Sequence, residues 1–377
     1  MRFPSAERLC RVQDPHRWTR EGRRLMVEAC REFARFHARR SADIAALYRR
    51  RGFEPDSIRT EADLARIPML GVTAMKRYLL TSLPRERAAL RLTSSGTRGQ
   101  KTQIWFDADS LARVQSMLTV QWEGEGLVSD RPTNYLMFVY DPAQAKDLGI
   151  AFSDKNQQRF APPARTFYAL TKDERGEWRF RLDEALARLR EYAEEGKPVR
   201  LFGMPGFVFE AVSALREPVR LPAGSWLVTG GGWKAAEDKK VSRADFRRLV
   251  TERLGLPGPN IRDAYGMAEH SAPYIDCARH RFHVPVFNRV LVRDPVTLDV
   301  VAPGEPGLLE LITPFNAMIP NLAILSTDLG RLDAGPCPCG YESPTFSILG
   351  RGGLAKHKGC ALHAGEIVTR QAAGASR

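Results

Sequence analysis

Long apolar runs are missing from this chain of 377 residues. No window approaches eighteen uninterrupted apolar residues, which is about the length that a membrane-spanning helix needs. The amino terminus, MRFPSAERLC, is basic and has no apolar core of the kind that a secretory signal carries. We therefore expect a cytoplasmic protein without a membrane span.

Cysteine is scarce, and internal repeats and low-complexity segments are missing. The composition is that of an ordinary globular chain, and the length predicts two or three subdomains rather than a single compact one. In a reducing compartment the few cysteines stay available for metal binding or chemistry. There are six of them: Cys10, Cys30, Cys277, Cys337, Cys339 and Cys360.

Acidic residues are the minority among the charged ones. The chain has 57 Lys and Arg against 44 Asp and Glu, a net charge of +13, and residues 1–60 alone hold 15 basic against 8 acidic side chains. A basic surplus raises nucleic-acid binding as a possibility. The arginines are, however, scattered around expected helices and not interleaved with aromatics. We interpret them as a solvated surface that also suits an anionic substrate such as ATP.

Strands alternate with helices through the middle of the chain, which predicts an α/β fold with a largely parallel sheet. Ser242 and Asp245 form a capping pattern, and Gly255 ends that helix. After about residue 284 strands prevail. We divide the chain into a basic helical segment (1–60), an α/β nucleotide-binding core (60–283), a β-rich subdomain (284–350) and a flexible tail (351–377). Expected helices cover 20–38, 108–122, 182–192 and 207–215, and expected strands cover 90–93, 135–140, 199–202, 226–229, 286–293 and 307–313.

The sharpest local signal is a run that we call the phosphate loop, residues 94–101, with the sequence SSGTRGQK. Glycines allow a tight turn that presents backbone N–H groups to an anion, and hydroxyls and a lysine add donors for phosphate. The run is not a Walker A loop, because Gln100 separates Gly99 from Lys101. By itself it fits either a phosphate site or an ordinary polar turn.

Three further motifs follow in order along the chain. Residues 230–234 read GGGWK and come directly after a buried strand, where ligands bind in open α/β sheets. Residues 265–269 read YGMAE, with an aromatic ring suited to a purine and a carboxylate suited to Mg²⁺. Residues 326–331 read STDLGR, with Asp328 suited to accept hydrogen bonds from ribose. Taken singly, each motif also has an ordinary structural interpretation. Residues 230–234 fit a flexible turn, residues 265–269 fit the start of a helix, and residues 326–331 fit a turn between strands.

Together and in this order, the four motifs resemble those of the adenylate-forming superfamily over about residues 60–360. Within it the chain is similar to the acyl-protein synthetases that serve a fatty acid reductase in bacterial luminescence, with phenylacetate–CoA ligases as cousins. Residues 94–101, 230–234 and the run KGCAL at 358–362 carry this resemblance. It implies an α/β fold: the large N-terminal domain of adenylate-forming enzymes, with layered αβα subdomains and a small β-barrel-like subdomain. The C-terminal lid domain is expected to be absent or vestigial.

The resemblance also implies an ATP and Mg²⁺ site. Lys101 and the loop contact the β- and γ-phosphates, while Glu269 binds Mg²⁺. The lysine that larger relatives bring from the lid has no clear counterpart, and Lys234, Lys356 and Lys358 are the alternatives. A Ser-Thr-Asp sequence replaces the family's Thr-Gly-Asp. The implied nucleotide-binding residues are Ser94, Ser95, Gly96, Thr97 and Gly99 of the loop, Gly231, Gly232, Tyr265 and Gly266 near adenine, Asp328 and Arg331 at the ribose, and Arg351 at the hinge.

Four of the cysteine and histidine residues form a possible zinc site. Cys337 and Cys339 are a close pair, and Cys277 lies upstream with His280 and His283 nearby. Three thiolates and one imidazole make a closed tetrahedral Zn²⁺ site. Unligated thiols near a turn are the alternative. Phenylacetate–CoA ligases carry a similar cluster, and that resemblance favours His283 as the histidine ligand.

Cys360 stands apart from this group. Lys356, His357 and Lys358 would lower the pKa of its thiol, and in acyl-protein synthetases a cysteine in this setting accepts the acyl group. We thus predict a ligase that activates a fatty or aryl acid as acyl-AMP, transfers it to Cys360 and delivers it to a partner such as an acyl reductase. An acyl-CoA ligase and a non-catalytic basic binding protein are the alternatives. The sequence does not identify the acid, although Tyr140, Phe152, Phe202 and Met204 are apolar candidates for its pocket.

Overall fold

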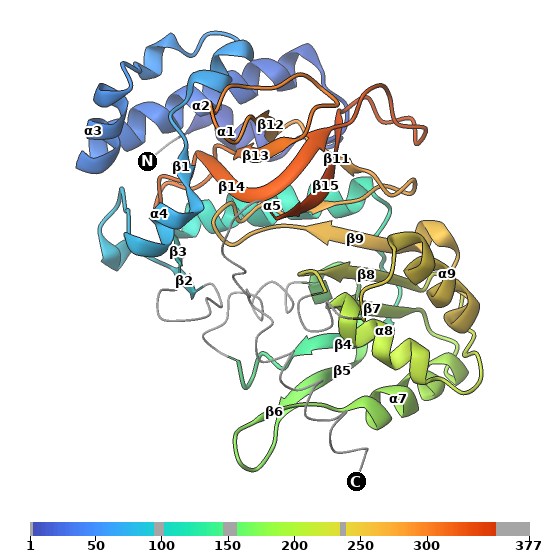
Figure 1. Ribbon diagram of the computed structural model, residues 1–377. Coiled ribbons are helices and arrows are strands. Elements are labelled where there is room, and N and C mark those ends of the chain that lie inside the picture. Colours follow the sequence, from blue (N-terminus) through green and yellow to red (C-terminus); the bar gives the residue numbers. More distant parts are fainter. Residues whose placement is uncertain (1–2, 94–101, 146–156, 234–238, 352–377) are drawn as a thin grey trace. The chain divides into compact units, whose positions relative to one another are not determined.

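Figure 1 shows the computed structural model of the chain, which describes residues 3–93, 102–145, 157–233 and 239–351. These residues divide into two compact units. Unit 1 combines the chain up to Thr93 with 102–126 and 266–351, and unit 2 is the described part of Leu127–Tyr265. Each unit has a hydrophobic cluster of its own. No helix within the described ranges is long and apolar enough to cross a membrane.

Unit 2 is built on a mostly parallel sheet in the order β9-β8-β7-β4-β5-β6. Only β6 runs antiparallel to its neighbour in this series. The strands are β4 (Thr133–Tyr140), β5 (Pro163–Lys172), β6 (Trp178–Phe180), β7 (Val199–Gly203), β8 (Trp226–Gly230) and β9 (Ile261–Tyr265). Every residue of β4 is buried, as expected for a strand covered on both faces.

Three helices supply the rest of the unit 2 core. They are α7 (Leu182–Glu194), α8 (Pro205–Ala214) and α9 (Arg243–Leu254), and their apolar residues share a cluster with those of the strands. The start of α9 is fixed as its sequence predicts, because Ser242 Oγ accepts a hydrogen bond of 3.1 Å from the Asp245 amide. Gly255 ends it at a φ of 70°, a conformation that favours glycine. The alternation expected from the sequence is confirmed here.

Unit 1 is built on an antiparallel sheet in the order β11-β15-β14-β13-β12, with the short β1 pairing in parallel with β14. A separate antiparallel pair, β2 and β3, flanks the phosphate loop. The strands are β1 (Leu70–Gly71), β2 (Leu90–Thr93), β3 (Gln103–Phe106), β11 (Phe282–His283), β12 (Arg289–Arg293), β13 (Gly307–Ile312), β14 (Ala323–Leu332) and β15 (Thr345–Arg351). The short β10 (Tyr274–Ile275) belongs to neither of these two sheets.

The helices of unit 1 are α1 (Pro4–Leu9), α2 (Arg20–Arg40), α3 (Ala42–Arg50), α4 (Val72–Arg77) and α5 (Ala108–Gly124). The leading segment does not form a body of its own. Phe3 stacks on Phe33 with ring centroids 4.1 Å apart, and both belong to the cluster that contains Phe106 and Phe315. The spatial division therefore does not fall at residues 60 and 284, because the first and last parts of the described chain share one core.

Candidate functional site

The residue that follows the phosphate loop contacts the candidate magnesium ligand. Thr102 is fully buried, and its Oγ1 donates a hydrogen bond of 2.6 Å to Glu269 Oε1. Glu269 is 6% exposed, and a carboxylate is a ligand type that Mg²⁺ accepts. Thr102 and Glu269, 167 residues apart in the chain, thus meet within unit 1. The loop residues Ser94, Ser95, Gly96, Thr97, Gly99 and Lys101 lie outside the described part of the chain.

The turn that carries Glu269 is held by buried polar groups. Asn321 Nδ2 donates to the Glu269 carbonyl at 2.9 Å. His270 is fully buried, with its Nε2 3.2 Å from the Tyr274 hydroxyl and 3.2 Å from Thr313 Oγ1. Burial lowers the pKa of His270 to about 3, so the ring stays neutral and acts here as a support. Sequence reasoning missed Thr102, Asn321 and His270, and only Thr102 had a signal, its place beside the loop.

The expected ribose residues lie in a long strand rather than in a turn. Asp328 and Arg331 are both in β14, with Asp328 half-buried and Arg331 exposed. The backbone ladder places Asp328 opposite Arg351 of β15, and the register shifts between Leu329 and Gly330. A side chain on Gly330 would come within 2.7 Å of the Ser347 carbonyl oxygen. The ladder therefore brings the candidate ribose and hinge positions together.

The expected adenine residues meet at one edge of the unit 2 sheet. Gly230 of β8 pairs with Ala264 of β9, so the next residues, Gly231 and Tyr265, follow side by side at the carboxyl ends of parallel strands. Ligands bind at this edge in open α/β sheets. Gly231 and Gly232 have φ values of 80° and 74°, which favour glycine. The structure thus places a glycine pair and a tyrosine at the ends of neighbouring strands, while Lys234 lies outside the described residues.

Two of the expected acid-pocket residues lie near the same strand ends. Met204 is buried directly after β7, and a Cβ on Gly231 would lie 3.7 Å from its side chain. Phe202 is half-buried in β7. Tyr140 instead packs edge-on against Trp178 at 4.6 Å, in the core, and Phe152 lies outside the described residues.

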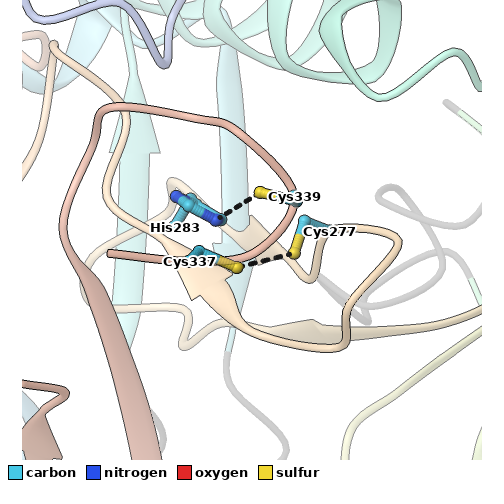
Figure 2. A group of neighbouring side chains, drawn as sticks. All are labelled: Cys277, His283, Cys337 and Cys339. Carbon is cyan, nitrogen blue, oxygen red and sulfur yellow. Dashed lines mark hydrogen bonds between the residues drawn. The ribbon is translucent and has the colours of Figure 1, made fainter. Parts of the chain in front are cut away.

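Figure 2 shows the second candidate site, in which Cys277, His283, Cys337 and Cys339 converge. Their ligand atoms all lie within 4.8 Å of one another. Cys277 Sγ lies 3.7 Å from Cys337 Sγ, and Cys339 Sγ lies 3.2 Å from His283 Nε2. Residues 60 positions apart in the chain are joined in this cluster, which could hold a metal ion.

The loops around the sulfur atoms have amides aimed at them. The amide of Arg279 donates to Cys277 Sγ at 3.3 Å, and that of Tyr341 to Cys339 Sγ at 3.5 Å. Burial raises the pKa of the Cys277 thiol to about 12 and lowers that of the His283 imidazole to about 4. Burial thus keeps the imidazole unprotonated as a ligand, and a cation would offset the cost of ionising the thiols.

His280, the alternative histidine, is outside this cluster. Its Nδ1 lies 3.5 Å from Asp276 Oδ2, and its backbone has a φ of 61° at the turn after Cys277. His283 lies in β11, pairing with Thr345 of β15. The strand pairing thus selects His283, because it carries that ring to the loop that holds Cys337 and Cys339.

Comparison with known proteins gives a consistent relationship. The family model described as "Acyl-protein synthetase, LuxE" matches residues 14–369. The chain belongs to this family. A long-chain-fatty-acid–luciferin-component ligase of Vibrio harveyi is 27% identical over 315 residues, which cover 81% of this chain and 79% of the relative. The ligase of the same name from Aliivibrio fischeri is 25% identical over 308 residues, with the same coverage.

Solved structures show the same fold. The 2-hydroxyisobutyryl-CoA ligase in an open conformation, bound to 2-HIB-AMP and CoA, matches 90% of this chain and 76% of its own length, with a TM-score of 0.67 and 17% identity. The same ligase in its thioesterification state gives a TM-score of 0.67 at 16% identity, over 90% of this chain and 70% of that structure. The α/β fold similar to adenylate-forming enzymes is confirmed.

Membership of the acyl-protein synthetase family confirms two predictions made from the sequence. The resemblance to that family is correct, and the chain is a ligase. The family supports ATP-dependent activation of an acyl group. Cys360, the expected acyl acceptor, lies outside the described residues, as do Lys356 and Lys358.

Proposed function

We propose that this acyl-protein synthetase activates a carboxylic acid as acyl-AMP and then carries the acyl group on Cys360. The observation that carries the adenylation step is the hydrogen bond from Thr102 to Glu269. It fixes a buried carboxylate directly beside the end of a loop whose composition suits phosphates. The family match, which extends through residue 369, supports assigning the second step to the segment around Cys360.

In the first step a carboxylate oxygen of the acid attacks the α-phosphorus of ATP. The bond from that phosphorus to the bridging oxygen breaks, and pyrophosphate leaves with the electron pair. Lys101 and the loop amides bind the β- and γ-phosphates and offset the charge that develops on them. Glu269 would hold Mg²⁺, which would supply further charge compensation, and Thr102 orients the Glu269 carboxylate.

Each unit offers residues for a part of the nucleoside, and we assign these residues unit by unit. Gly231 and Gly232 lie against adenine with Tyr265 stacked on it, and Gly266 keeps the turn after Tyr265 narrow, since a Cβ there would come within 3.1 Å of Pro273. Asp328 accepts from the ribose hydroxyls, with Arg331 and Arg351 on the same pair of strands. A lysine near the α-phosphate completes the site, and Lys234, Lys356 and Lys358 remain the three alternatives.

In the second step the Cys360 thiolate attacks the acyl carbon of acyl-AMP. The carbon–oxygen bond to phosphate breaks, AMP leaves, and a thioester remains on the protein. The acyl group then passes to a partner protein. The relatives are named as ligases of long-chain fatty acids and a luciferin component, so we assign a fatty acid as the substrate and an acyl reductase as the partner. A cytoplasmic location stays a prediction.

A labelling experiment tests the carrier step. The full-length protein is incubated with ATP, Mg²⁺ and a radiolabelled fatty acid, then digested and mapped. Label is expected on the peptide that contains Cys360. Hydroxylamine should release this label, because it cleaves a thioester. Cys360→Ser should lose the label and keep ATP–pyrophosphate exchange, whereas the control Cys30→Ser, at a fully buried position, should still become labelled at Cys360.

Two other results would favour the alternatives. Acyl-CoA formation that persists in Cys360→Ser, without any label on the wild-type protein, would identify an acyl-CoA ligase. A wild-type protein that catalyses no pyrophosphate exchange with any fatty or aryl acid would contradict every enzymatic proposal and leave a basic binding protein.

The cluster of Cys277, His283, Cys337 and Cys339 is proposed to hold a structural Zn²⁺. Three cysteine sulfur atoms and one imidazole nitrogen lie close together, as in closed zinc sites. Two backbone amides also donate hydrogen bonds to the sulfur atoms. Elemental analysis of the purified protein should find about one zinc per chain, as four ligands hold one ion. A protein that contains less than half an equivalent of zinc but still catalyses pyrophosphate exchange would contradict the zinc proposal. It would not contradict the enzymatic proposal.

A further inference from the structure

A row of buried polar groups leads away from His283 on the side opposite the sulfur atoms. His283 Nδ1 lies 3.0 Å from the Ser343 carbonyl oxygen and 2.9 Å from Ser343 Oγ. The same Oγ lies 3.2 Å from His16 Nδ1, and His16 Nε2 lies 3.3 Å from Glu125 Oε1. His16, Ser343 and His283 are at most 3% exposed, and Glu125 is 8% exposed. These groups come from four separate stretches of unit 1.

We infer that Ser343, His16 and Glu125 are the outer shell of the metal site, positioning His283 toward the ion and tying residues 14–18 to it. This inference rests on the zinc that we propose for the cluster. It does not depend on the proposed acyl chemistry. Outer-shell partners of this kind fix the orientation and tautomer of a histidine ligand and strengthen it as a donor.

The backbone of Ser343 determines the tautomer of His283. A backbone carbonyl oxygen can only accept a hydrogen bond, so His283 Nδ1 must carry the hydrogen. In the neutral ring the lone pair is then on Nε2. That nitrogen is the one directed at Cys339 Sγ, 3.2 Å away (Figure 2). Ser343 therefore holds the ring with its ligand atom facing the sulfur atoms.

The Ser343 hydroxyl links His283 to His16, and the Glu125 carboxylate lies close to the other ring nitrogen of His16. Because His283 Nδ1 donates to Ser343, the Ser343 hydroxyl hydrogen is available for His16 Nδ1. His16 then carries its own hydrogen on Nε2, facing the Glu125 carboxylate. Glu125 thus places a buried carboxylate 3.3 Å from His16 Nε2, at the end of the row.

Packing and backbone hydrogen bonds also hold His16 in place. Its ring stacks on Tyr341 at 4.5 Å, and Tyr341 meets His283 edge-on at 5.2 Å. Backbone contacts align the same stretch: the Val286 amide donates to the Pro15 carbonyl at 2.7 Å, and Trp18 Nε1 donates to the Val284 carbonyl at 3.0 Å. Residues 14–18, which precede α2, thus lie beside residues 284–286, which follow His283.

The experiment measures zinc affinity on the full-length protein by competition with a chromophoric chelator. Ser343→Ala and His16→Phe should each weaken zinc binding about 10-fold or more, in line with outer-shell changes at other sites, and Ser343→Thr should restore it. The matched control is Ser82→Ala, because Ser82 and His37 form another buried serine–histidine pair of unit 1, 2.8 Å apart. That variant should bind zinc as the wild type does.

Two further readouts separate positioning from general destabilisation. The visible spectrum of the Co²⁺-loaded protein should change in Ser343→Ala and stay unchanged in Ser82→Ala, because it reports the nitrogen donor. Chelation should speed amide exchange in residues 14–18 of the wild type.

Wild-type zinc affinity in both Ser343→Ala and His16→Phe would overturn the inference, and so would equal losses in Ser82→Ala. A wild-type protein that binds no zinc would overturn both this inference and the zinc proposal. The proposed acyl chemistry is tested separately, by pyrophosphate exchange and by labelling of Cys360.

Discussion

Thr102 shows how one buried hydroxyl can matter to a charged site. Its hydrogen bond to Glu269 is made in the interior, where both residues are at most 6% exposed. A hydrogen bond to a charged group contributes about 1.5–3 kcal/mol, more than one between neutral groups. The bond also limits the positions that the Glu269 carboxylate can adopt.

Replacing Thr102 with valine keeps the shape and removes the hydroxyl. We expect Thr102→Val to lower ATP–pyrophosphate exchange by about 10- to 100-fold, the equivalent of that hydrogen bond, and to raise the Mg²⁺ concentration needed for half-maximal rate. Thr102→Ser should recover most of the rate.

The matched control is Thr133→Val, since Thr133 is 1% exposed and its Oγ1 donates to the Arg131 carbonyl at 2.8 Å in unit 2. Equal losses in both valine variants, with no change in Mg²⁺ dependence, would show that Thr102 serves only the packing.

Glu310 is a second buried carboxylate, with a consequence for stability. It is fully buried and accepts a hydrogen bond of 2.6 Å from Arg293 Nε. Burial raises the pKa of Glu310 from its ordinary value of 4.5 to about 7, against the opposing effect of Arg293. Between these two pH values the folded state binds more protons than the unfolded state, so the free energy of unfolding falls as pH rises.

We expect this group to remove up to about 3 kcal/mol of stability between pH 4.5 and 7, because one pKa unit corresponds to about 1.4 kcal/mol. Glu310→Gln should abolish that part of the slope in urea-unfolding series over this range. The exposed Glu305→Gln controls for the loss of one charge, and an unchanged slope in Glu310→Gln would contradict the assignment.

At the scale of elements, the close packing of β4 on β7 depends on a glycine at the strand end. Gly203 pairs with Phe138, and a Cβ on Gly203 would lie 2.4 Å from the Phe138 carbonyl oxygen. The backbone must move to admit any side chain, and this edge carries the candidate adenine and acid residues.

Gly203→Ala should therefore destabilise the protein by about 1–3 kcal/mol, as overpacking does in a dense core, and weaken ATP binding through the shift of β7. Calorimetry and nucleotide titration measure the two effects. Gly258→Ala is the control, since a Cβ at Gly258 meets nothing within 4 Å. A Gly203→Ala protein as stable as this control would contradict the packing argument.

Local sequence patterns predict some of these elements and fail to predict others. Helices α2 and α9 and strands β4 and β8 follow from apolar spacing and capping residues, because those signals are local. Residues 326–331 fitted a turn by composition, yet they lie in β14, because pairing with β13 and β15 outweighs the local preference of Asp328 and Gly330. The short strands β1 and β11 depend wholly on such partners.

At the scale of the whole molecule, the two units have separate interiors. Phe207, fully buried, belongs to the unit 2 cluster, and Phe315, also fully buried, belongs to that of unit 1. The described residues of unit 2 all lie between Leu127 and Tyr265, whereas those of unit 1 come from three separate parts of the chain. Core truncations should therefore act mainly on the unit that contains them.

We expect Phe207→Ala and Phe315→Ala each to cost about 3–5 kcal/mol of local stability, the usual effect of removing a buried ring. Hydrogen exchange measured by mass spectrometry should show lost protection in β4–β9 for the first and in β12–β15 for the second. Each variant is the control for the other. Equal loss in both units from either change would mean that they unfold as one.

The sequence by itself determined the family and the ligase class, and it singled out the three cysteines that converge with His283, because motif order and residue type are properties of the chain. It did not reveal Thr102 beside Glu269, or His16 and Glu125 behind His283. Resemblance alone favoured His283 over His280, and the pairing of β11 with β15 places His283 beside the three cysteines. These contacts join residues from 60 to 327 positions apart. Only tertiary packing brings such groups together, since nothing in the local spacing of a residue records which distant strand will lie against it.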